Sequence, residues 1–446
     1  MSAVVVEESE MKTSHGGKLP RAVFLIQFFA VGLGYLLYTF NRTAFPIGLK
    51  NISASLGFSV IEMSTLGTIF LVGQGLIGIP AGFWNSTKGR RGITYRTNAI
   101  MLIGTVGTGV MSLVLSYLAL NFPLTLTYRI LFGIFEGMFN ISVYSFAGSA
   151  LPERRAFVNM CLGFFYAAGA MLGPWVFSQI LAAAPADSGW RFGLSIFGAV
   201  SIILGVLIFS AMTILLYRTK SSAVPAEAMQ RERAAPSESA VNVLKDVLSR
   251  KSLWKGLVIH ALNLFTMWDF IGGMPSIMAR YQHRDVLFIG AVFGLGFGLT
   301  SAVSPLFGLL ADKFGRRLVV LILGTADIVA LYLLIFHPMG QWVTTLLAFV
   351  VGVGVNSVYF MGYTLAQDGV PLYRVPIATG IAGAMGYLIA GFAGPLHGWV
   401  SMLTNWQTAC VVIMIIPQIL AVVAALSFLP GIAQWKQLRR EGKAIA

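Results

Sequence analysis

The sequence has 446 residues, of which 57% are hydrophobic and only 11% are charged. An ordinary soluble domain carries about 25% charged residues, and a soluble fold could not cover so much apolar surface, so the composition excludes one. The formal net charge of +14 raises the question of nucleic-acid binding. The basic residues, however, lie almost entirely outside the apolar stretches, in the tails, the loops and the linker. Membrane topology explains this pattern, and we expect no nucleic-acid partner.

Twelve mostly apolar stretches, each long enough to cross the roughly 30 Å hydrocarbon core, are separated by short polar or Gly/Pro-containing breaks. They span residues 22–48, 64–85, 97–119, 124–148, 158–183, 192–217, 256–278, 287–310, 318–336, 343–366, 377–402 and 406–429. We therefore predict an all-α, multi-pass integral membrane protein that contacts the lipid bilayer.

The distribution of basic residues predicts the orientation. With a cytoplasmic N-terminus, 25 of the 31 Lys and Arg fall in the tails and in the loops after even-numbered helices, which places both termini in the cytoplasm. The first twenty residues lack the apolar core of a signal peptide, so the first helix is expected to stay in the mature protein. The predicted parts are a cytoplasmic N-tail (1–21), a six-helix bundle (22–217), a cytoplasmic linker (218–255), a second six-helix bundle (256–429) and a cytoplasmic C-tail (430–446).

The predicted helix 22–48 carries Tyr35, Tyr38 and Arg42 on one face, with Asn41 beside the arginine. A guanidinium near phenol hydroxyls suits the binding of a carboxylate, because arginine offers planar, bidentate hydrogen bonding. The alternative for Arg42 is a side chain that extends to the outer membrane interface. Gln74 is a lone amide in the helix 64–85 and is a further binding candidate, although such amides more often join helices.

The predicted helix 124–148 places Arg129, Glu136, Asn140 and Tyr144 on one face. Ionisable groups at the bilayer centre cost roughly 2.5 to 3.5 kcal/mol each, so they are functional candidates. Arg129 and Glu136 are two helical turns apart, about 10 Å, so each needs another partner. We take Arg129 and Asn140 as binding candidates and Glu136 as a further functional candidate.

The long polar stretch after the sixth helix reads as a linker, with a short amphipathic helix around residues 241–248. In the next predicted helix, 256–278, Trp268 and Asp269 precede Gly272, Gly273 and Pro275, a breakable stretch of the kind that lines sites in transporters. Asp269 is expected to carry a proton or to face a cationic part of the substrate, or else to bond a neighbouring helix. Trp268 is a binding candidate.

Helix 343–366 carries a polar and aromatic stripe from which we take Asn356 and Tyr363 as binding candidates. Asp327, in helix 318–336, is expected to lie at the periphery. His260 and His397 are expected to pack between helices rather than to relay protons.

The two halves repeat a loop pattern: residues 82–91 read G-F-W-N-S-T-K-G-R-R, and residues 308–317 read G-L-L-A-D-K-F-G-R-R. The second copy matches in full the cytoplasmic signature of the major facilitator superfamily, G-x-x-x-D-[RK]-x-G-[RK]-[RK]. The chain thus resembles that superfamily over nearly its whole length. The resemblance implies two pseudo-symmetric six-helix bundles, with a substrate site near the midplane between them.

The signature is expected to act as a conformational latch, in which glycines let helices approach, the acid faces an arginine or a helix N-terminus, and basic residues stay in cytoplasmic water. The alternative is a basic loop that only sets topology. The first copy has Ser86 in place of the acid, whereas Asp312 could engage Arg154, Arg155 or the start of the fifth helix. The predicted latch residues are Gly82, Gly89, Arg90, Arg91, Gly308, Asp312, Gly315, Arg316 and Arg317.

Residues 129–137, R-I-L-F-G-I-F-E-G, followed by L-P-E-R-R at 151–155, resemble the anion:cation symporter branch of the superfamily. That branch includes sialic acid, hexonate and vesicular glutamate transporters, and its first helix often carries an acid-Arg pair, which aligns with Asn41 and Arg42. The resemblance implies that Arg42 anchors the anion, that Arg129 is a structural or binding charge, and that Glu136 is the protonatable carboxylate. Asn41 removes one expected carboxylate, and Asp269 is a candidate to replace it.

The leading hypothesis is therefore a secondary active transporter that takes up a small organic anion, a carboxylate or sugar acid, together with protons. One proton per monoanion is expected unless Asp269 also titrates. An alternative is proton-coupled export of amphipathic compounds or drugs, suggested by the G-x-x-x-G-P segment at 169–174 and by the many aromatic residues. A third is a membrane sensor that binds a ligand without transporting it.

Other classes of protein find little support. The two cysteines, Cys161 and Cys410, both lie in apolar stretches, so we expect neither a disulfide framework nor a metal site. Phosphate-binding loops and nucleophile elbows are missing from the sequence, so we expect no enzyme and no cofactor. The short loops favour a monomer in a bacterial inner membrane.

Overall fold

The computed structural model describes residues 21–86, 93–151, 154–185, 188–219, 239–368, 370–371 and 374–440. All regular elements in these ranges are helices, and twelve stretches are long and apolar enough to cross a membrane. The prediction of an all-α membrane protein with twelve transmembrane helices is confirmed.

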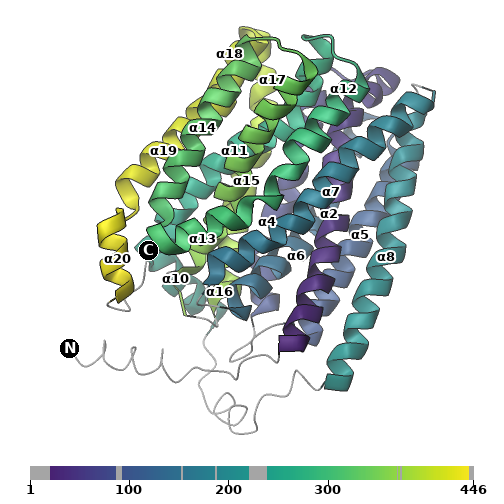
Figure 1. The fold of residues 1–446 in the computed structure, drawn as a ribbon. Coiled ribbons are helices and arrows are strands. Elements are labelled where there is room, and N and C mark those ends of the chain that lie inside the picture. Colours follow the sequence, from purple (N-terminus) through teal and green to yellow (C-terminus); the bar gives the residue numbers. More distant parts are fainter. Residues whose placement is uncertain are drawn as a thin grey trace.

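The first six spans form one side of the molecule in Figure 1, where successive helices run up and down the bundle because the loops between them are short. The second span is interrupted at Ile69, between α3 and α4. The helices are α2 (Arg21–Leu56), α3 (Val60–Thr68) with α4 (Phe70–Asn85), α5 (Tyr95–Leu118), α6 (Phe122–Ala150), α7 (Arg155–Ala183) and α8 (Gly189–Thr219).

The last six spans are more often interrupted. The eighth and twelfth each contain a wider, π-helical segment, and the eleventh is broken at Phe392. The elements are α11 (Lys251–Arg280); α12 (Val286–Ala291), η2 (Val292–Phe297), η3 (Gly298–Ala302) and α13 (Ser304–Phe314); α14 (Arg316–Phe336); α15 (Gln341–Asp368); α16 (Val375–Gly391) with α17 (Ala393–Leu403); and α18 (Trp406–Cys410), η5 (Val411–Ile415) and α19 (Ile416–Phe428).

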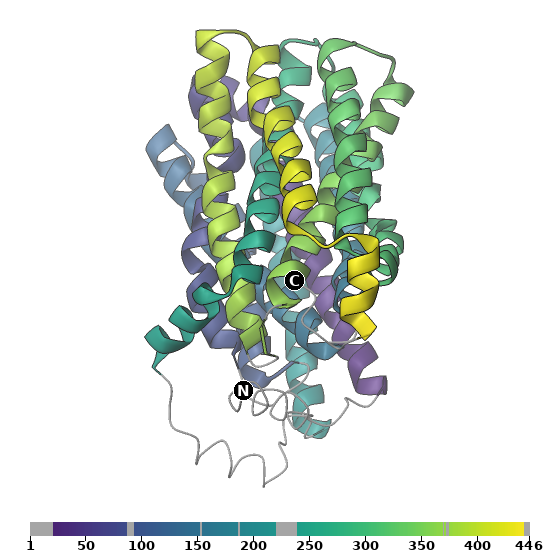
Figure 2. The ribbon, with the colours of Figure 1, turned by 90° about the vertical axis from the view of Figure 1, so that its left-hand side faces the viewer.

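Two short helices lie outside the spans. The amphipathic segment expected around residues 241–248 is α10 (Ala240–Ser249), and the predicted C-tail contains α20 (Ile432–Arg440). Figure 2 shows both beside the same end of the bundle. Several spans are also longer than predicted, since α2 continues to Leu56 and α11 already begins at Lys251. Apolarity marks where a chain enters lipid, whereas caps and turns set the ends of a helix.

We name the two ends of the bundle after residues found there. At the Gly315 end α13 meets α14, and at the Leu56 end α2 stops. The halves touch at both ends. At the Gly315 end, a Cβ on Gly78 of α4 would lie 2.8 Å from the carbonyl oxygen of Gly380 in α16, and at the Leu56 end a Cβ on Gly67 would lie 2.9 Å from the carbonyl oxygen of Gly272. Only glycine permits such close helix contacts, so both ends are closed in this structure.

Gln367 of α15 joins the halves by hydrogen bonds at the Gly315 end. Its Nε2 donates to the backbone oxygen of Tyr144 at 3.1 Å, and its Oε1 accepts from Asn159 Nδ2 at 3.2 Å. Its own backbone oxygen accepts from Arg155 Nη1 at 2.6 Å. These bonds tie α6 and α7 of the first half to α15 of the second.

The loop signature also holds the Gly315 end, but within the second half. Arg316 Nη1 lies 2.7 Å from Asp312 Oδ1, and Arg316 Nη2 lies 3.1 Å from Asp368 Oδ2, so one guanidinium joins α13, α14 and α15. Gly315 has φ of +101°, which favours glycine, and packs under Trp435 of α20. The expectation that these basic residues stay in water is wrong for Arg316, which is buried because two carboxylates bind it and the Trp435 ring covers it.

The other predicted latch residues divide into three groups. Gly308 packs against Ala156 and Met160 of α7, and Gly82 packs against Pro376 of α16, so both glycines lie at contacts between the halves. Arg317 is partly exposed. The remaining three, Gly89, Arg90 and Arg91, lie outside the described residues.

Replacing Gln367 with alanine is expected to loosen the Gly315 end. The change removes the side-chain hydrogen bonds to Tyr144, Asn159 and Thr379, each worth about 1 kcal/mol, so backbone amides of α7 and α15 near this end should exchange with solvent about tenfold faster or more. Hydrogen exchange followed by mass spectrometry measures this rate.

The matched control is Gln418→Ala, since Gln418 is an equally buried glutamine that bonds Asp327 within the second half. It should leave exchange in α7 unchanged. Equal exchange of α7 in both variants would show that Gln367 does not hold the halves together.

Candidate functional site

The centre of the bundle holds an arginine that is buried against both halves. Arg42 lies on α2 and is 1% exposed. Its Nη1 donates to the hydroxyl of Tyr38, one helical turn earlier, and its guanidinium carbon lies 3.6 Å from the ring centroid of Trp268 on α11. The alternative in which Arg42 extends to the membrane interface is therefore wrong. Trp268 holds the side chain in the protein interior.

The carboxylate of Glu136, on α6, is the counter-charge of Arg42, but the pair is loose. Arg42 Nε lies 3.9 Å from Glu136 Oε2, beyond hydrogen-bonding distance. Glu136 Oε2 instead accepts from Gln74 Nε2 at 2.6 Å, and the same amide nitrogen lies 3.1 Å from the Tyr38 hydroxyl. Arg42 Nε and Nη2, Glu136 Oε1 and Gln74 Oε1 are all buried without a hydrogen-bond partner. The cluster thus contains buried donors and acceptors that no protein group satisfies.

Arg129 lies nearer the Leu56 end of α6 and is also buried. Its Nε donates to the backbone oxygen of Leu66 at 3.3 Å, and its guanidinium carbon lies 3.9 Å from the Phe45 ring centroid and 4.6 Å from that of Phe70. As expected from the helical spacing, Arg129 and Glu136 each have partners elsewhere. Two guanidinium groups and one carboxylate leave this region with a net positive charge when Glu136 is ionised.

A second polar cluster, on the Gly315 side of Glu136 along α6, joins the halves through tyrosine hydroxyls. Asn140 Nδ2 lies 2.6 Å from the Tyr387 hydroxyl and 3.1 Å from that of Tyr363, and its Oδ1 accepts from Tyr359 at 3.3 Å. Nearby, the hydroxyls of Tyr35 and Tyr144 are 2.6 Å apart. The ring centroid of Tyr387 also lies 5.7 Å from the guanidinium carbon of Arg42, so Tyr387 lies beside both clusters.

The structure thus brings most of the predicted binding residues together. Around Arg42 and Asn140 it gathers Tyr35, Tyr38, Gln74, Glu136, Trp268 and Tyr363, with Arg129 beside them. Asn41 is not in this group. It points the other way, between α5 and α8, where Nδ2 bonds Ser201 and Oδ1 accepts from Ser112 at 3.1 Å. Arg42 is the next residue along the helix. Consecutive residues point about 100° apart around a helix axis, so the side chains of Asn41 and Arg42 face different neighbours.

Two further candidates also lie apart from the central group. Asn356 bonds Thr300 in the eighth span at 2.8 Å, within the second half. Asp269 follows Trp268 in sequence but bonds His397 of α17. Asp327 accepts from Gln418 at 2.8 Å in the last span and lies outside the central group.

Sequence reasoning missed several members of the central group. Tyr359 and Tyr387 complete the Asn140 cluster. Tyr359 lies on the same face of α15 as Asn356 and Tyr363, so the spacing could have found it, whereas nothing in the sequence marks Tyr387. His260, expected to pack between helices, has its ring stacked on Tyr359 and tilted against Tyr363, with centroids 5.7 and 4.8 Å away, and both its nitrogens are buried without a partner.

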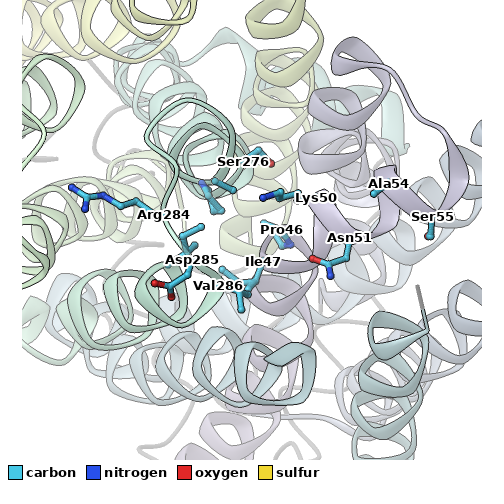
Figure 3. A pocket seen from close by; sticks show the side chains of 13 residues that line it. Pro46, Ile47, Lys50, Asn51, Ala54, Ser55, Ser276, Arg284, Asp285 and Val286 are labelled. Atoms are coloured by element: carbon cyan, nitrogen blue, oxygen red, sulfur yellow. The ribbon is translucent and has the colours of Figure 1, made fainter. Parts of the chain in front are cut away.

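A cavity of about 420 Å³ opens at the Leu56 end, between α2, α11 and α12. Figure 3 shows its lining, in which Lys50 of α2 and Ser276 of α11 point into the same space, whereas Arg284 extends away from Lys50. The cavity therefore lies where the two halves meet at this end.

Two transporters of known sequence are similar to this chain. A protein described as a probable L-galactonate transporter from Escherichia coli is 24% identical over 309 residues, which are 66% of this chain and 62% of that protein, less than two thirds of its length. A probable 4-methylmuconolactone transporter from Cupriavidus pinatubonensis is 24% identical over 331 residues, covering 73% of this chain and 72% of that one.

Solved structures share the fold. A proton:xylose symporter, XylE, superimposes with a TM-score of 0.62 at 17% identity, over 95% of this chain and 98% of that chain. A bacterial homologue of the human lysosomal transporter Spinster, in an inward-facing conformation, gives 0.61 at 15% identity over 92% and 96%. At these identities the likeness concerns the fold alone.

The family model of the Major Facilitator Superfamily matches residues 31–274 and 257–444, which together cover most of the sequence. The match agrees with the expectation of a transporter rather than an enzyme. With its twelve spans and the loop signature at 308–317, the chain belongs to the major facilitator superfamily.

Proposed function

We propose that the protein is a secondary active transporter that moves a small organic carboxylate together with a proton by alternating access. The observation that carries this proposal is the Arg42 guanidinium, which is buried where the halves meet and has two nitrogens without hydrogen-bond partners. A buried charge in this condition needs a counter-ion, and a planar carboxylate fits the fork of an arginine.

Glu136 supplies the link to protons. While the site is empty, its carboxylate is the nearest counter-charge of Arg42, although 3.9 Å separates Nε from Oε2. A substrate carboxylate that binds Arg42 directly takes over this role, and a second anion so close is unfavourable at a buried position. Glu136 then takes up a proton, so anion and proton bind together.

The tyrosine–asparagine cluster favours a substrate that also carries hydroxyl groups. Asn140, Tyr363 and Tyr387 place an amide and two hydroxyls within reach of a polyol chain whose carboxylate is at Arg42. A sugar acid has both features. The name of the L-galactonate transporter from Escherichia coli supports this choice of substrate class.

We also propose the orientation and location predicted from charge. The Gly315 end, with its basic loops, then faces the cytoplasm, both termini are cytoplasmic, and the chain works as a monomer in a bacterial inner membrane. Alternation between the two ends requires the glycine contacts at Gly78 and at Gly67 to separate in turn.

The G-x-x-x-G-P segment that suggested an exporter has a packing role in this structure. A Cβ on Gly169 would lie 2.3 Å from the backbone oxygen of Leu36, and one on Gly173 would lie 2.5 Å from that of Phe40. The segment thus seats α7 on α2 within one half. Export of amphipathic compounds and ligand sensing without transport are the two alternative functions.

Replacing Arg42 with alanine should abolish stabilisation by L-galactonate. Hydrogen bonds to a charged group contribute about 1.5 to 3 kcal/mol, so the affinity should fall at least tenfold and the rise in melting temperature should vanish. Thermal unfolding of the purified protein measures this, with galactitol as the matched polyol that lacks the carboxylate.

Arg191→Ala is the control, since Arg191 bonds the backbone oxygens of Ser116 and Ala119 away from the central cluster. It should keep the L-galactonate effect. Stabilisation of all three proteins by tetraphenylphosphonium, with none by L-galactonate, would replace this proposal with the exporter.

Replacing Glu136 with glutamine should separate transport from proton coupling. Glutamine resembles the protonated acid, so labelled L-galactonate should still exchange across a proteoliposome membrane, while accumulation driven by a proton gradient should fall about tenfold or more. Filter assays of uptake and counterflow measure the two. Undiminished gradient-driven accumulation would place the proton elsewhere, and binding without any exchange in the parent protein would favour the sensor.

A further inference from the structure

Asp269 and His397 form a buried carboxylate–imidazole pair away from the central cluster. Asp269 Oδ2 lies 2.7 Å from His397 Nδ1, which joins α11 to α17. The aspartate side chain is 0% exposed and the histidine side chain 5%. The pair has no net charge when it holds one proton, as an ion pair or as two neutral groups, and carries a net charge of −1 without it.

The second oxygen of Asp269, Oδ1, is buried and has no hydrogen-bond partner. A Cβ on Gly273, one turn further along α11, would meet Asp269 Oδ1 at 3.3 Å, and among the described residues no other side chain comes within 4 Å of that position. This side of α11 is therefore bare next to the carboxylate.

The bare surface leads toward the cavity at the Leu56 end. Asp269, Gly273 and Ser276 lie on one face of α11, with about 10 Å between the first and last along the axis. Ser276 lines the cavity of Figure 3, and its hydroxyl is buried without a partner. The face of α11 that carries Asp269 and Gly273 thus continues to Ser276 at the wall of the cavity.

The pair also lies between two contacts that close the Leu56 end. Gly272 of α11 packs against Gly67 of α3, and on α17 a Cβ at Gly394 would lie 2.1 Å from the backbone oxygen of Ser64. Both helices of the pair therefore touch the first half. Separation of the halves at this end would give water access to both members.

Other ionisable side chains near the pair have their own environments. The thiol of Cys410 is buried at the end of α18, an element that packs on α17. Other elements pack on α11 or α17 and carry ionisable side chains near the centre or toward the Leu56 end. These side chains are Arg42, Lys50, Glu62, Asp285 and Tyr387. Arg42 contacts Tyr38 and Glu136, Glu62 caps α3 at Ser59, and Asp285 caps α12.

We propose that Asp269 and His397 form a second proton-binding site, which exchanges protons with the cavity at the Leu56 end and is separate from Glu136. One proton enters from the cavity at the Leu56 end, binds the pair and neutralises it. After the Leu56 end has closed and the Gly315 end has opened, the proton leaves to the water that enters from the Gly315 side. Closure of the Leu56 end favours the protonated pair, because the deprotonated pair would bury a net charge. The role of this proton in coupling, though not the site itself, rests on the proposed function.

Infrared difference spectra of the purified full chain between acidic and alkaline pH test the site without any substrate. The parent protein should show one carboxyl and one imidazole signal that titrate together. Asp269→Asn should lose both changes, and His397→Gln should lose the imidazole signal and move the carboxyl titration. Glu136→Gln and Asp327→Asn, each of which removes another buried carboxylate, should keep the coupled signals. Coupled signals that persist in Asp269→Asn, or their absence from the parent, would overturn the proposal.

A second measurement tests the access route. Gly273→Val should fill the bare surface and slow the deuterium shift of the His397 imidazole bands, whose N–H is present in both forms of the pair, after transfer to heavy water. Gly340→Ala, at a glycine with open space around it, should not. An unchanged rate in Gly273→Val contradicts exchange along this face.

Proteoliposomes then test coupling. With two protons per monoanion, one positive charge moves inward per cycle, so an inside-negative potential should accelerate uptake of L-galactonate by the parent. Asp269→Asn and His397→Gln should lose this acceleration. Absence of any L-galactonate transport would refute the proposed function but leave the infrared result standing, and voltage-independent uptake by the parent would refute the second coupled proton.

Discussion

The loose pair of Arg42 and Glu136 is the interaction on which the rest of the structure depends. A guanidinium in the middle of twelve apolar helices is costly unless other groups compensate its charge. Here the compensation is divided among a carboxylate at 3.9 Å, the Tyr38 hydroxyl and the face of Trp268. Since the first two come from one half and Trp268 from the other, the charge itself joins the halves. Its two unpartnered nitrogens can still donate hydrogen bonds, and a substrate carboxylate can supply the acceptors.

The packing around the centre suits a transporter whose two ends must open in turn. Contacts between the halves are made at both ends by backbone at glycines such as Gly78 and Gly67, and at the Gly315 end also by the hydrogen bonds of Gln367. Contacts of this kind can separate and reform without unpacking large side chains. By contrast, Arg316 and the two carboxylates that bind it lie inside the second half, so this part of the signature stabilises one bundle. Gly308 of the same signature packs against the other bundle.

The twelve spans could be predicted from the apolar stretches of the sequence. The central charged residues could be predicted from the free-energy cost of burying a charge in a membrane. Arg42 and Glu136 could be named because the membrane makes every internal charge conspicuous. The same reasoning misplaced Asn41, since residues adjacent on a helix face different neighbours and a polar side chain in a membrane can as easily bond α5 and α8. Tyr387 and the pairing of His397 with Asp269 could not be foreseen, because they depend on which faces of α16 and α17 meet the other helices. The spacing along one helix carries no information about such contacts.

The central claim is that the anion and a proton bind together at Arg42 and Glu136. The most direct measurement is the number of protons taken up when L-galactonate binds the purified protein, obtained by calorimetry in buffers that differ in their ionisation enthalpy. The account predicts the uptake of close to one proton per anion by the parent protein near neutral pH, and none by Glu136→Gln. Binding with no proton uptake by the parent, or with the same uptake in Glu136→Gln, would contradict it.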